Sequence, residues 1–482
     1  MLLPVFLFLL APPEPESIEM QLKRFTQALA IIEEQAADPV STEQAIYGGA
    51  IPGMLRKLDP FSSFFDPNQF EQLKQLEKSV QKGFGTVVSV LPGRVIVLQV
   101  VANTPSARAG VSPGDEIIGI NNVPLAGLEP EQLIGLLSQA RQMQIVIAVR
   151  RPGNVRIQQF QLTPENVDSP SVDRAFLVQP NIGMIRIASF DEKTSSTLHD
   201  SIEQLGGNKL KGLILDMRTN PGGLVPAALE TASFFLEPGQ RIFSVRGRNA
   251  KEQNVDVPKG STPYRFPVAI LVNEKTASAA EIVTGALQDH DRATVIGEPS
   301  FGKGLVQSVY PLGAGAAVAL TTAFYYTPSG RSIQKPIADS ALGATTTAAA
   351  TLPEYKTAKG KSLKGGGGIQ PDFLVSPDSA SRFRQVLELS GSFAQYATEL
   401  IRRAGKVDEH YTVTPETLDQ FRLFLSDRNI QPGLAEWSVE RNYMRSRLQQ
   451  EVFNQTLGVA KGDELEAQRD PAVLKALDVL GS

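Results

Sequence analysis

The sequence predicts an α/β protein built from several domains, and three observations support this prediction. The chain has 482 residues, which at roughly 100–200 residues per domain corresponds to about three domains. Between residues 182 and 326, short apolar segments typical of buried strands alternate with amphipathic segments typical of helices. Helical periodicity dominates both ends of the chain. With 42% hydrophobic and 20% charged residues, the chain has enough apolar side chains for packed cores.

Composition excludes several classes of function. The net charge is −4 and no dense lysine and arginine stripe occurs, which argues against a nucleic-acid-binding protein. The chain has no cysteine, so it has no disulfides, no cysteine nucleophile and no cysteine metal ligand. Its three histidines, His199, His290 and His410, form no HxxxH or HxH pair, so a histidine-built metal site is not expected. We expect neither a metal nor an organic cofactor.

Residues 1–15 are predicted to be an export signal or a membrane-proximal segment. Leu2 to Leu10 form an apolar run of the length found in signal peptides, too short to span a bilayer. No basic residue precedes this run and no clear A-x-A cleavage site follows it, so a short apolar tail is the alternative. The segment suggests an extracytoplasmic location, in the periplasm or on the cell-envelope side, with membrane-surface association as a variant.

Residues 16–82 are predicted to be a helical region. Ile18, Leu22, Phe25, Leu29 and Ile32 recur at spacings of three and four, which places them on one face of a helix. Such a face packs either on the rest of the chain or on a second copy. A homodimer formed through the N- or C-terminal helices is therefore one hypothesis, and packing within the chain is the other.

Residues 83–162 change to a strand-rich pattern. β-Branched segments flank the turn signal Pro92-Gly93, and a helical segment, "EPEQLIGLLSQA", precedes a final strand, "QIVIAVRR". The intervening "TPSARAGVSPGDEIIGINN" resembles the signature of bacterial PDZ domains. The resemblance implies a domain that binds extended peptides, commonly C-termini, by adding a strand to a sheet edge.

Five residues of this segment are candidates for peptide binding. In Gly83, Phe84 and Gly85 the glycines permit backbone N–H groups to converge on a terminal carboxylate. Leu133 and Leu137 are one helical turn apart and could line an apolar side-chain pocket. The alternative for the glycines is a simple turn at the start of a strand.

Residues 163–376 are predicted to form the core domain. Apolar strands such as "GLILDMR" and "VAILVN" alternate with helices such as "SAAEIVTGALQ", a pattern that indicates βαβ units and a largely parallel sheet. Within this region, residues 338–368 are rich in alanine, threonine, lysine and glycine and are predicted to be a flexible insertion. Residues 377–482 are predicted to be a helical appendage without a catalytic motif.

Ser278 and Lys303 are the candidate catalytic residues of the core domain. A serine hydroxyl is a weak nucleophile until a neighbouring base takes its proton. A lysine serves as that base only when burial disfavours its charged form, and the apolar Phe301, Leu305 and Val306 offer such a setting. Taken alone, Ser278 would more often be a helix N-cap, and a lysine between two glycines would more often lie in a solvated turn.

The expected position of Ser278 also favours an oxyanion hole. "TASAAE" joins the end of a strand to the start of an amphipathic helix, where free N–H groups and the helix dipole stabilise negative charge. The N–H of Ala279 is one candidate donor. The turn "NPGG" offers a second at Gly222 or Gly223, because glycine permits close approach of the backbone.

Together these motifs resemble those of the carboxyl-terminal processing proteases, also called tail-specific proteases, of the Ser-Lys class. The resemblance runs from about residue 58 to residue 372 in matching order, through "LDPFSSFFDP", the PDZ segment, "LDMRTNPGG", "TASAAEIVTGALQDHDRA", "SFGKGLVQ", "TPSGRSI" and "GIQPD". It implies a ClpP/crotonase-like βαβ core with an inserted PDZ domain. It also implies Ser278 as nucleophile, Lys303 as base and Gln307 as the residue that orients the lysine amine. Thr276 and Ala280 replace the flanking serines of the family's run.

The resemblance implies a serine endopeptidase that acts on unfolded or C-terminally tailed proteins and needs no cofactor. Two other readings stay open. One is a non-catalytic peptide- or lipid-binding module on the same core, although binding alone does not require Ser278, Lys303 and Gln307 together. The other is a Ser-Lys hydrolase of non-peptide amides or esters. Penicillin-recognising enzymes are disfavoured, because no lysine stands three positions after Ser278.

Overall fold

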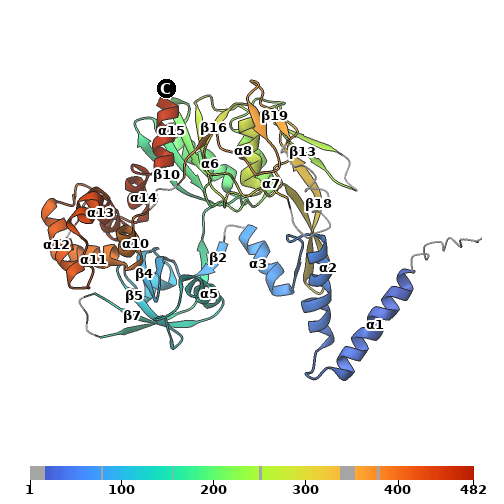
Figure 1. The fold of residues 1–482 in the computed structure, drawn as a ribbon, viewed down its shortest axis with the longest axis horizontal. Helices are drawn as coiled ribbons and strands as arrows, with labels where there is room; N and C mark the ends of the chain where they lie inside the picture. Colours follow the sequence, from blue (N-terminus) through green and yellow to red (C-terminus); the bar gives the residue numbers. More distant parts are fainter. Residues whose placement is uncertain are drawn as a thin grey trace, which may run out of the picture. The chain divides into compact units, whose positions relative to one another are not determined.

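A computed structural model describes residues 17–481, apart from 78–79, 153, 155, 249–251, 337–352, 377–379 and 406. The predicted export segment, residues 1–15, lies outside the described residues. The chain divides into two compact units. Within the described residues, the smaller unit comprises residues 17–70 and 307–321, and the larger unit holds the remainder (Figure 1).

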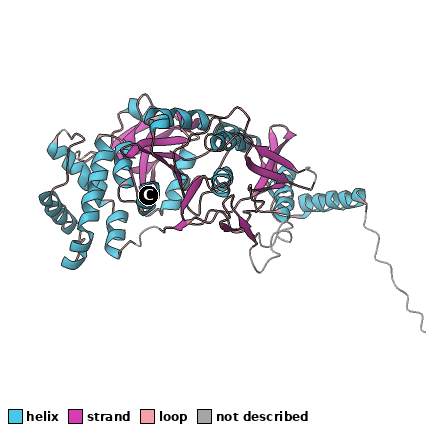
Figure 2. Cartoon of the chain, turned by 90° about the horizontal axis from the view of Figure 1, so that it is seen from above, coloured by secondary structure: helices cyan, strands magenta, loops and turns pink. Residues whose placement is uncertain are grey.

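The centre of the larger unit is a six-stranded sheet whose strands follow the order β10-β11-β12-β15-β16-β21. Every neighbouring pair is parallel except β10 and β11, which confirms the predicted α/β class (Figure 2). The strands are β10 (Val172–Gln179), β11 (Ile182–Ile187), β12 (Gly212–Asp216), β15 (Val268–Val272), β16 (Ala293–Gly297) and β21 (Phe373–Leu374). Every residue of β12 and β15 is buried, as expected for strands covered on both faces.

Two hydrophobic layers cover the faces of this sheet, because successive strand side chains point to opposite sides. Leu213, Leu215 and Ile270 belong to the layer that includes α6 (Thr194–Leu205), α7 (Val225–Ser233) and α8 (Ala279–Asp289). Ile214 and Leu271 face the other way, against α15 (Pro471–Gly481). The last helix is therefore an integral layer of the core, whereas the sequence suggested an appendage.

The PDZ domain is a second sheet, of order β3-β4-β5-β7-β8, with the short β6 paired to β5. Its elements are β3 (Thr86–Leu91), β4 (Arg94–Val100), α4 (Pro105–Ala109), β5 (Glu116–Ile120), β6 (Val123–Pro124), α5 (Pro130–Ala140), β7 (Ile145–Arg150) and β8 (Gln158–Leu162). The segments that enter and leave the domain, β2 (Val80–Gly83) and β9 (Glu165–Asp168), pair with each other in antiparallel register.

The C-terminal region is a helical bundle with its own aromatic core. Phe393, Tyr396, Phe421 and Phe424 contact one another at ring-centroid distances between 5.0 and 6.1 Å. The helices are α10 (Arg382–Leu389), α11 (Ser392–Ala404), α12 (Pro415–Ser426), α13 (Leu434–Thr456) and α14 (Val459–Ala467). The predicted helical character of this region is confirmed.

The smaller unit contains α1 (Ile18–Gln35), a π-helical turn (Gln44–Ala50), α2 (Ile51–Leu58), β1 (Ser63–Phe65) and the start of α3 (Pro67–Glu77). The predicted helical face of α1 forms, but the helix contains no buried residue, and Ile18 and Leu22 are exposed. In this unit β1 pairs with the first part of β18 (Ala316–Tyr326). No helix in the described part of the chain combines the length and apolar character needed to cross a membrane.

The predicted flexible insertion differs from the structure over its second half. Residues 338–352 lie outside the described residues, but β19 (Glu354–Lys356) and β20 (Ser362–Lys364) form a hairpin. Gly365 packs so closely that a Cβ atom would come within 2.8 Å of the Tyr355 ring. The glycines therefore permit close packing of this segment. The remaining elements are a 3-10 turn (Gly207–Lys209), β13 (Arg241–Arg246), β14 (Gln253–Asp256) and β17 (Leu305–Gly313).

Candidate active site

Ser278 lies in the turn that joins the end of β15 to the start of α8. Its backbone has φ 56° and ψ −117°, a conformation that L-residues rarely adopt. Such strain costs about 1–3 kcal/mol and persists only where surrounding contacts enforce it. A strained strand-to-helix turn is also how α/β-hydrolases expose their nucleophilic serine. The backbone at Ser278 thus points to a functional role, which a simple N-cap would not require.

The helix that follows Ser278 is completely buried and begins at Ala279. The first N–H groups of a helix have no partner within the helix, and the helix dipole adds a partial positive charge there. The Ala279 N–H is therefore placed where a developing oxyanion would be stabilised.

The glycine turn after β12 packs directly against the serine turn. A Cβ atom on Gly222 would come within 2.8 Å of the Ser278 Cβ, and one on Gly223 within 2.0 Å of the Phe190 carbonyl oxygen. Both glycines have positive φ angles, of 96° and 140°. In this structure the Gly222 N–H donates to Asn220 Oδ1 at 2.8 Å. The side chain of Asn220 thus fixes the turn that lies against Ser278.

Three further hydrogen bonds join the glycine turn to the serine turn. The Ala277 N–H donates to the Asn220 carbonyl at 2.8 Å. The Thr276 hydroxyl donates to the Met217 carbonyl at 2.8 Å, and the Thr219 N–H donates to Asn273 Oδ1 at 2.8 Å. These bonds set the spacing between the two candidate sources of oxyanion donors. The threonine at position 276 therefore performs a defined structural task.

Glu281 connects the turn that contains Ser278 (the serine turn, residues 273–278) to the loop that contains Lys303 (the lysine loop, residues 298–304). Its carboxylate has no exposed surface, and its Oε2 atom accepts hydrogen bonds from both the Ser278 N–H and the Lys303 N–H at 2.9 Å. Its Oε1 atom accepts from the Gly302 N–H at 2.7 Å and from the Ser300 hydroxyl. Because one oxygen atom binds both N–H groups, the backbones of Ser278 and Lys303 lie close together.

The protonation of Glu281 reflects two opposed effects. Complete burial raises the pKa of Glu281, and the hydrogen bonds from Ser300, Lys303, Gly302 and Ser278 act in the opposite direction. Burial is the larger effect, so the pKa lies above the usual range of a glutamate. Four donors directed at the carboxylate match the ionised form, which only accepts hydrogen bonds.

The lysine loop is closely packed around a half-buried Lys303. A Cβ atom on Gly302 would lie 2.6 Å from the Lys335 Cγ atom, and one on Gly304 would lie 3.0 Å from the Gln334 N atom. Leu305 is buried, as expected, but Phe301 is 43% exposed. The apolar setting predicted for the lysine is thus only partly present, because the Phe301 side chain is directed to solvent.

Gln307 lies on β17, four residues beyond Lys303, and belongs to the smaller unit. Its side-chain nitrogen Nε2 donates a hydrogen bond of 2.7 Å to the Phe61 carbonyl oxygen. Phe61 belongs to the "LDPFSSFFDP" segment, which is 246 residues away in the sequence. The orientation of the Gln307 amide is thus set within the smaller unit.

A groove of about 380 Å³ lies beside β3. Gly83, Phe84, Gly85 and Leu137 line it, together with Asp173 and Ala188 from outside the PDZ domain. Leu133, by contrast, is fully buried in the domain core and does not line the groove. Two residues four positions apart on a helix differ in direction by about 40°, because four residues make slightly more than one full turn. This offset leaves Leu133 facing the sheet while Leu137 reaches the groove.

Gly85 has a backbone conformation that suits a carboxylate-binding turn. Its φ is 76°, and a Cβ atom there would come within 2.2 Å of Thr104. The Phe84 carbonyl accepts a hydrogen bond from the Ser106 N–H, and the Gly85 carbonyl accepts one from the Val101 N–H. In a planar trans peptide the N–H points opposite to the C=O. The N–H groups of Gly85 and Thr86 therefore point away from the segment that contains Val101 and Ser106.

Three residues near the site have structural contacts. His290 ends α8, and its ring contacts the Arg241 carbonyl at 2.7 Å. Asp289 forms an ion pair of 2.8 Å with Arg331, and both side chains are buried. Asp216 accepts hydrogen bonds from Arg218 at the start of the glycine turn and so stabilises this turn.

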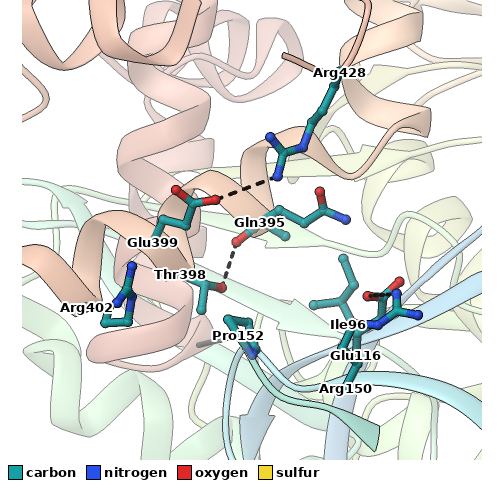
Figure 3. A pocket seen from close by; sticks show the side chains of 11 residues that line it. Ile96, Glu116, Arg150, Pro152, Gln395, Thr398, Glu399, Arg402 and Arg428 are labelled. Atoms are coloured by element: carbon teal, nitrogen blue, oxygen red, sulfur yellow. Dashed lines mark hydrogen bonds and ion pairs between the residues drawn. The ribbon is translucent and has the colours of Figure 1, made fainter. Parts of the chain in front are cut away.

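A separate cavity of about 500 Å³ is lined by PDZ residues and by the C-terminal helices (Figure 3). Glu116 forms an ion pair with Arg150 on one wall at 3.2 Å, and Glu399 pairs with Arg428 on the other at 3.6 Å. This cavity contains none of the candidate catalytic residues. We therefore do not treat it as the reaction site.

Sequence reasoning did not identify Glu281, Asn220 or Asn273 as contributors to the site. Glu281 had a recognisable signal, because Ser278-x-x-Glu281 follows the capping-box pattern at a helix start. The roles of the two asparagines depend on turns that meet only in three dimensions. Periodicity along the chain contains no information on such contacts.

Comparison with known proteins gives two family matches. The model of peptidase family S41 matches residues 181–340, and a PDZ domain model matches residues 96–151. The chain is 36% identical over 319 residues to the carboxy-terminal-processing protease of Bartonella bacilliformis, covering 65% of this chain and 73% of the relative. It is 33% identical over 312 residues to the chloroplastic carboxyl-terminal-processing peptidase 2 of Arabidopsis thaliana, covering 62% of this chain and 60% of the relative.

Solved structures with similar folds include the photosystem II D1 C-terminal processing protease. Its sequence identity is 24% and its TM-score 0.42, over 75% of this chain and 94% of that chain. A putative S41 protease from Bacteroides fragilis has 14% identity and a TM-score of 0.44, over 83% of this chain and all of that chain.

The family matches define a serine-type peptidase that carries a PDZ domain. More particularly, the chain belongs to the carboxy-terminal processing proteases of peptidase family S41.

Proposed function

We propose that this protease captures C-terminal tails of unfolded or tailed proteins on its PDZ domain and cleaves peptide bonds with Ser278, Lys303 and Gln307. The observation that carries the proposal is the buried Glu281 carboxylate. One of its oxygens binds the backbones of both the strained Ser278 and Lys303. A binding module would have no need for a strained serine backbone beside a lysine.

The proposed reaction proceeds in two half-reactions. Ser278 Oγ attacks the peptide carbonyl while the neutral Lys303 amine takes the hydroxyl proton. Lys303 then gives this proton to the leaving amine, and the peptide bond breaks to leave an acyl-enzyme. A water molecule, deprotonated by Lys303, attacks the ester, and the proton returns to Ser278 Oγ as the acid is released. Gln307 orients the lysine amine through its side-chain carbonyl.

The proposed oxyanion hole contains the Ala279 N–H and a second N–H from the glycine turn. Gly222 lies against Ser278, but its N–H would have to leave Asn220 Oδ1 in order to serve. The Gly223 N–H is the alternative donor from the same turn. Removing one such donor typically lowers kcat by about 10²–10³-fold.

Tail recognition is proposed for the groove lined by Gly83, Phe84, Gly85 and Leu137. The terminal carboxylate would bind the backbone N–H groups of Gly83, Phe84 and Gly85, and an apolar side chain would enter beside Leu137. The extracytoplasmic location and the homodimer remain predictions from the sequence. The exposed apolar side chains of α1 are compatible with the homodimer.

The test is hydrolysis of an unfolded substrate with a free C-terminal tail. We expect Ser278→Ala and Lys303→Ala to abolish cleavage while tail binding persists. Lys275→Ala is the matched control, because Lys275 is exposed and lies three residues before Ser278. Undiminished cleavage by either catalytic variant would exclude the mechanism. Tail capture without turnover by the unmodified protein would favour the binding module, and turnover of simple esters alone would favour the non-peptide hydrolase.

A further inference from the structure

We propose that Asp59 is a positioning residue for catalysis, acting through the Phe61 carbonyl on the amide of Gln307. The inference rests on the proposed function, because it assumes that Gln307 orients the Lys303 amine. All contacts that carry it lie within the smaller unit. It assigns a task to the "LDPFSSFFDP" segment, which the reaction scheme leaves unused.

Asp59 organises a tight turn at the end of α2. Its side chain is 1% exposed, and its Oδ1 atom accepts hydrogen bonds of 2.7 Å from the N–H groups of Phe61 and Ser62. Its Oδ2 atom accepts a third, also of 2.7 Å, from the Ser62 hydroxyl. A carboxylate that accepts three hydrogen bonds within three residues leaves the backbone of this turn little freedom.

The turn is also attached to the strand that follows Gln307 in the hairpin. The Ser62 Oγ atom accepts a hydrogen bond of 3.1 Å from the Thr321 N–H. One residue further on, β1 pairs with β18 through Ser63 and Ala319. The turn therefore has a fixed position relative to the β17–β18 hairpin, which includes Gln307.

The Phe61 carbonyl is the group through which Asp59 acts on Gln307. It accepts the Gln307 Nε2 hydrogen bond at 2.7 Å and a weaker one of 3.2 Å from the Ser63 hydroxyl. A carbonyl oxygen can only accept, so the Gln307 amide must direct its NH₂ group toward Phe61. The amide oxygen, bonded to the same carbon as the nitrogen, is thereby directed to the other side of the amide group.

This orientation matters because the two ends of an amide have opposite hydrogen-bonding properties. In the proposed mechanism the Gln307 oxygen accepts from the Lys303 amine. A rotation of 180° about the last side-chain bond would present an NH₂ group instead, and two donors repel each other. Loosening the Asp59 turn would remove the acceptor that prevents this rotation. Misplacement of a catalytic group by about 1 Å can cost on the order of 10²-fold in rate.

The experiment is a double-mutant cycle on cleavage of the tailed unfolded substrate. We expect Asp59→Ala and Gln307→Ala each to lower kcat about 10-fold with little change in KM, because neither residue is proposed to bind the substrate tail. In the Gln307→Ala background, adding Asp59→Ala should have no further effect on kcat, since its target is already absent. Asp66→Ala is the matched control. Asp66 caps α3 through the Gln69 N–H and makes no contact with the Phe61 carbonyl.

Each outcome of the cycle decides one question. Independent losses from Asp59→Ala and Gln307→Ala that multiply in the double variant would overturn the positioning role while leaving the proposed function intact. An equal loss from Asp66→Ala would also overturn it, because the effect would then be general destabilisation of the segment. Full activity of Gln307→Ala would instead reject the assumed role of Gln307. If Asp59→Ala fails to fold, Ser62→Ala and Ser62→Thr replace it. We expect Ser62→Ala to lower kcat and the conservative Ser62→Thr to retain it.

Discussion

At the residue scale, the buried carboxylate of Glu281 organises the proposed reaction site. Its carboxylate binds three backbone N–H groups and one hydroxyl from two separate loops. Burying an ionised group without such partners would cost several kcal/mol. The site thus depends on an acid that must stay ionised inside the core.

Replacing this acid should uncouple the two loops. In Glu281→Gln the new NH₂ group faces N–H donors, and each unsatisfied buried donor costs about 1–3 kcal/mol. We expect cleavage to fall about 100-fold, while far-ultraviolet circular dichroism stays unchanged. Glu274→Gln, an exposed glutamate in the same loop, is the control and should retain full activity. Wild-type rates from Glu281→Gln would show that the carboxylate is dispensable.

The same residue gives the activity a dependence on pH. Burial raises the pKa of Glu281 above its ordinary value of 4.5, so the carboxylate becomes protonated at a higher pH than an exposed glutamate. The ionised form makes the hydrogen bonds, and these are lost as pH falls through the raised pKa. Acid loss of activity should therefore begin above pH 4.5, and initial rates across a pH series measure this onset.

Some of the individual residues of the candidate site could be predicted from the sequence and others could not. Ser278, Lys303 and Gln307 could be proposed as catalytic residues because their motifs occur in a fixed order with small residues around them. Asp59 and Asn220 could not be predicted. Asp59 is proposed to act on Gln307, which is distant in sequence and bonds the Phe61 carbonyl only in the folded chain. Asn220 fixes the turn at Gly222, and this turn meets Ser278 only in the tertiary fold. Leu133 was assigned to the groove, since helical spacing alone does not distinguish the core from its edge.

At the element scale, α8 connects the reaction site to the protein interior. The helix begins directly after Ser278 and ends at Asp289, whose carboxylate pairs with the buried Arg331 at 2.8 Å. The Asp289 Oδ2 atom also accepts the Ser329 N–H at 2.9 Å, and Arg331 donates to Gln288 Oε1 at 2.6 Å. The "TPSGRSI" segment therefore holds the far end of α8.

Removing one partner of this buried pair should be strongly destabilising. Asp289→Ala leaves the Arg331 charge without its counter-ion, and we expect a loss of about 3–5 kcal/mol in the free energy of unfolding. Urea denaturation followed by circular dichroism measures this loss. Asp291→Asn, two residues further on, is the control and should change stability by less than about 1 kcal/mol. The double variant Asp289→Leu/Arg331→Met should recover part of the loss, because neither charge then remains buried.

Helices and strands could be predicted from the sequence where apolar residues follow one pattern along the whole element. They could not be predicted where contacts with distant parts of the chain determine the structure. The strands "GLILD" and "VAILV" were predictable because residues buried on both sides of a sheet form continuous apolar runs. The helix α15 was predictable as a helix, but not as a covering layer of the sheet. The β19–β20 hairpin escaped prediction because the glycine run after it suggested flexibility, whereas Gly365 in this run packs closely against Tyr355.

At the scale of the whole molecule, the PDZ domain is an insertion whose two connections meet. Gly83 at the end of β2 pairs with Glu165 at the start of β9, so the chain enters and leaves the domain at adjacent points. This register means that the domain can be removed without pulling the flanking strands apart.

Excision of the PDZ domain should therefore separate specificity from chemistry. Replacing residues 84–164 by Asn-Gly would join β2 and β9 through a two-residue turn of the type that suits hairpins. We expect the excised protein to cleave an unfolded substrate with a free C-terminus and its C-terminally amidated counterpart at equal rates, whereas the intact protein prefers the free carboxylate. Matched kcat/KM measurements on the two substrates quantify the preference. If the excised protein still discriminates between them, recognition of the terminal carboxylate must lie outside the PDZ groove, because the excision removes the groove residues Phe84, Gly85 and Leu137.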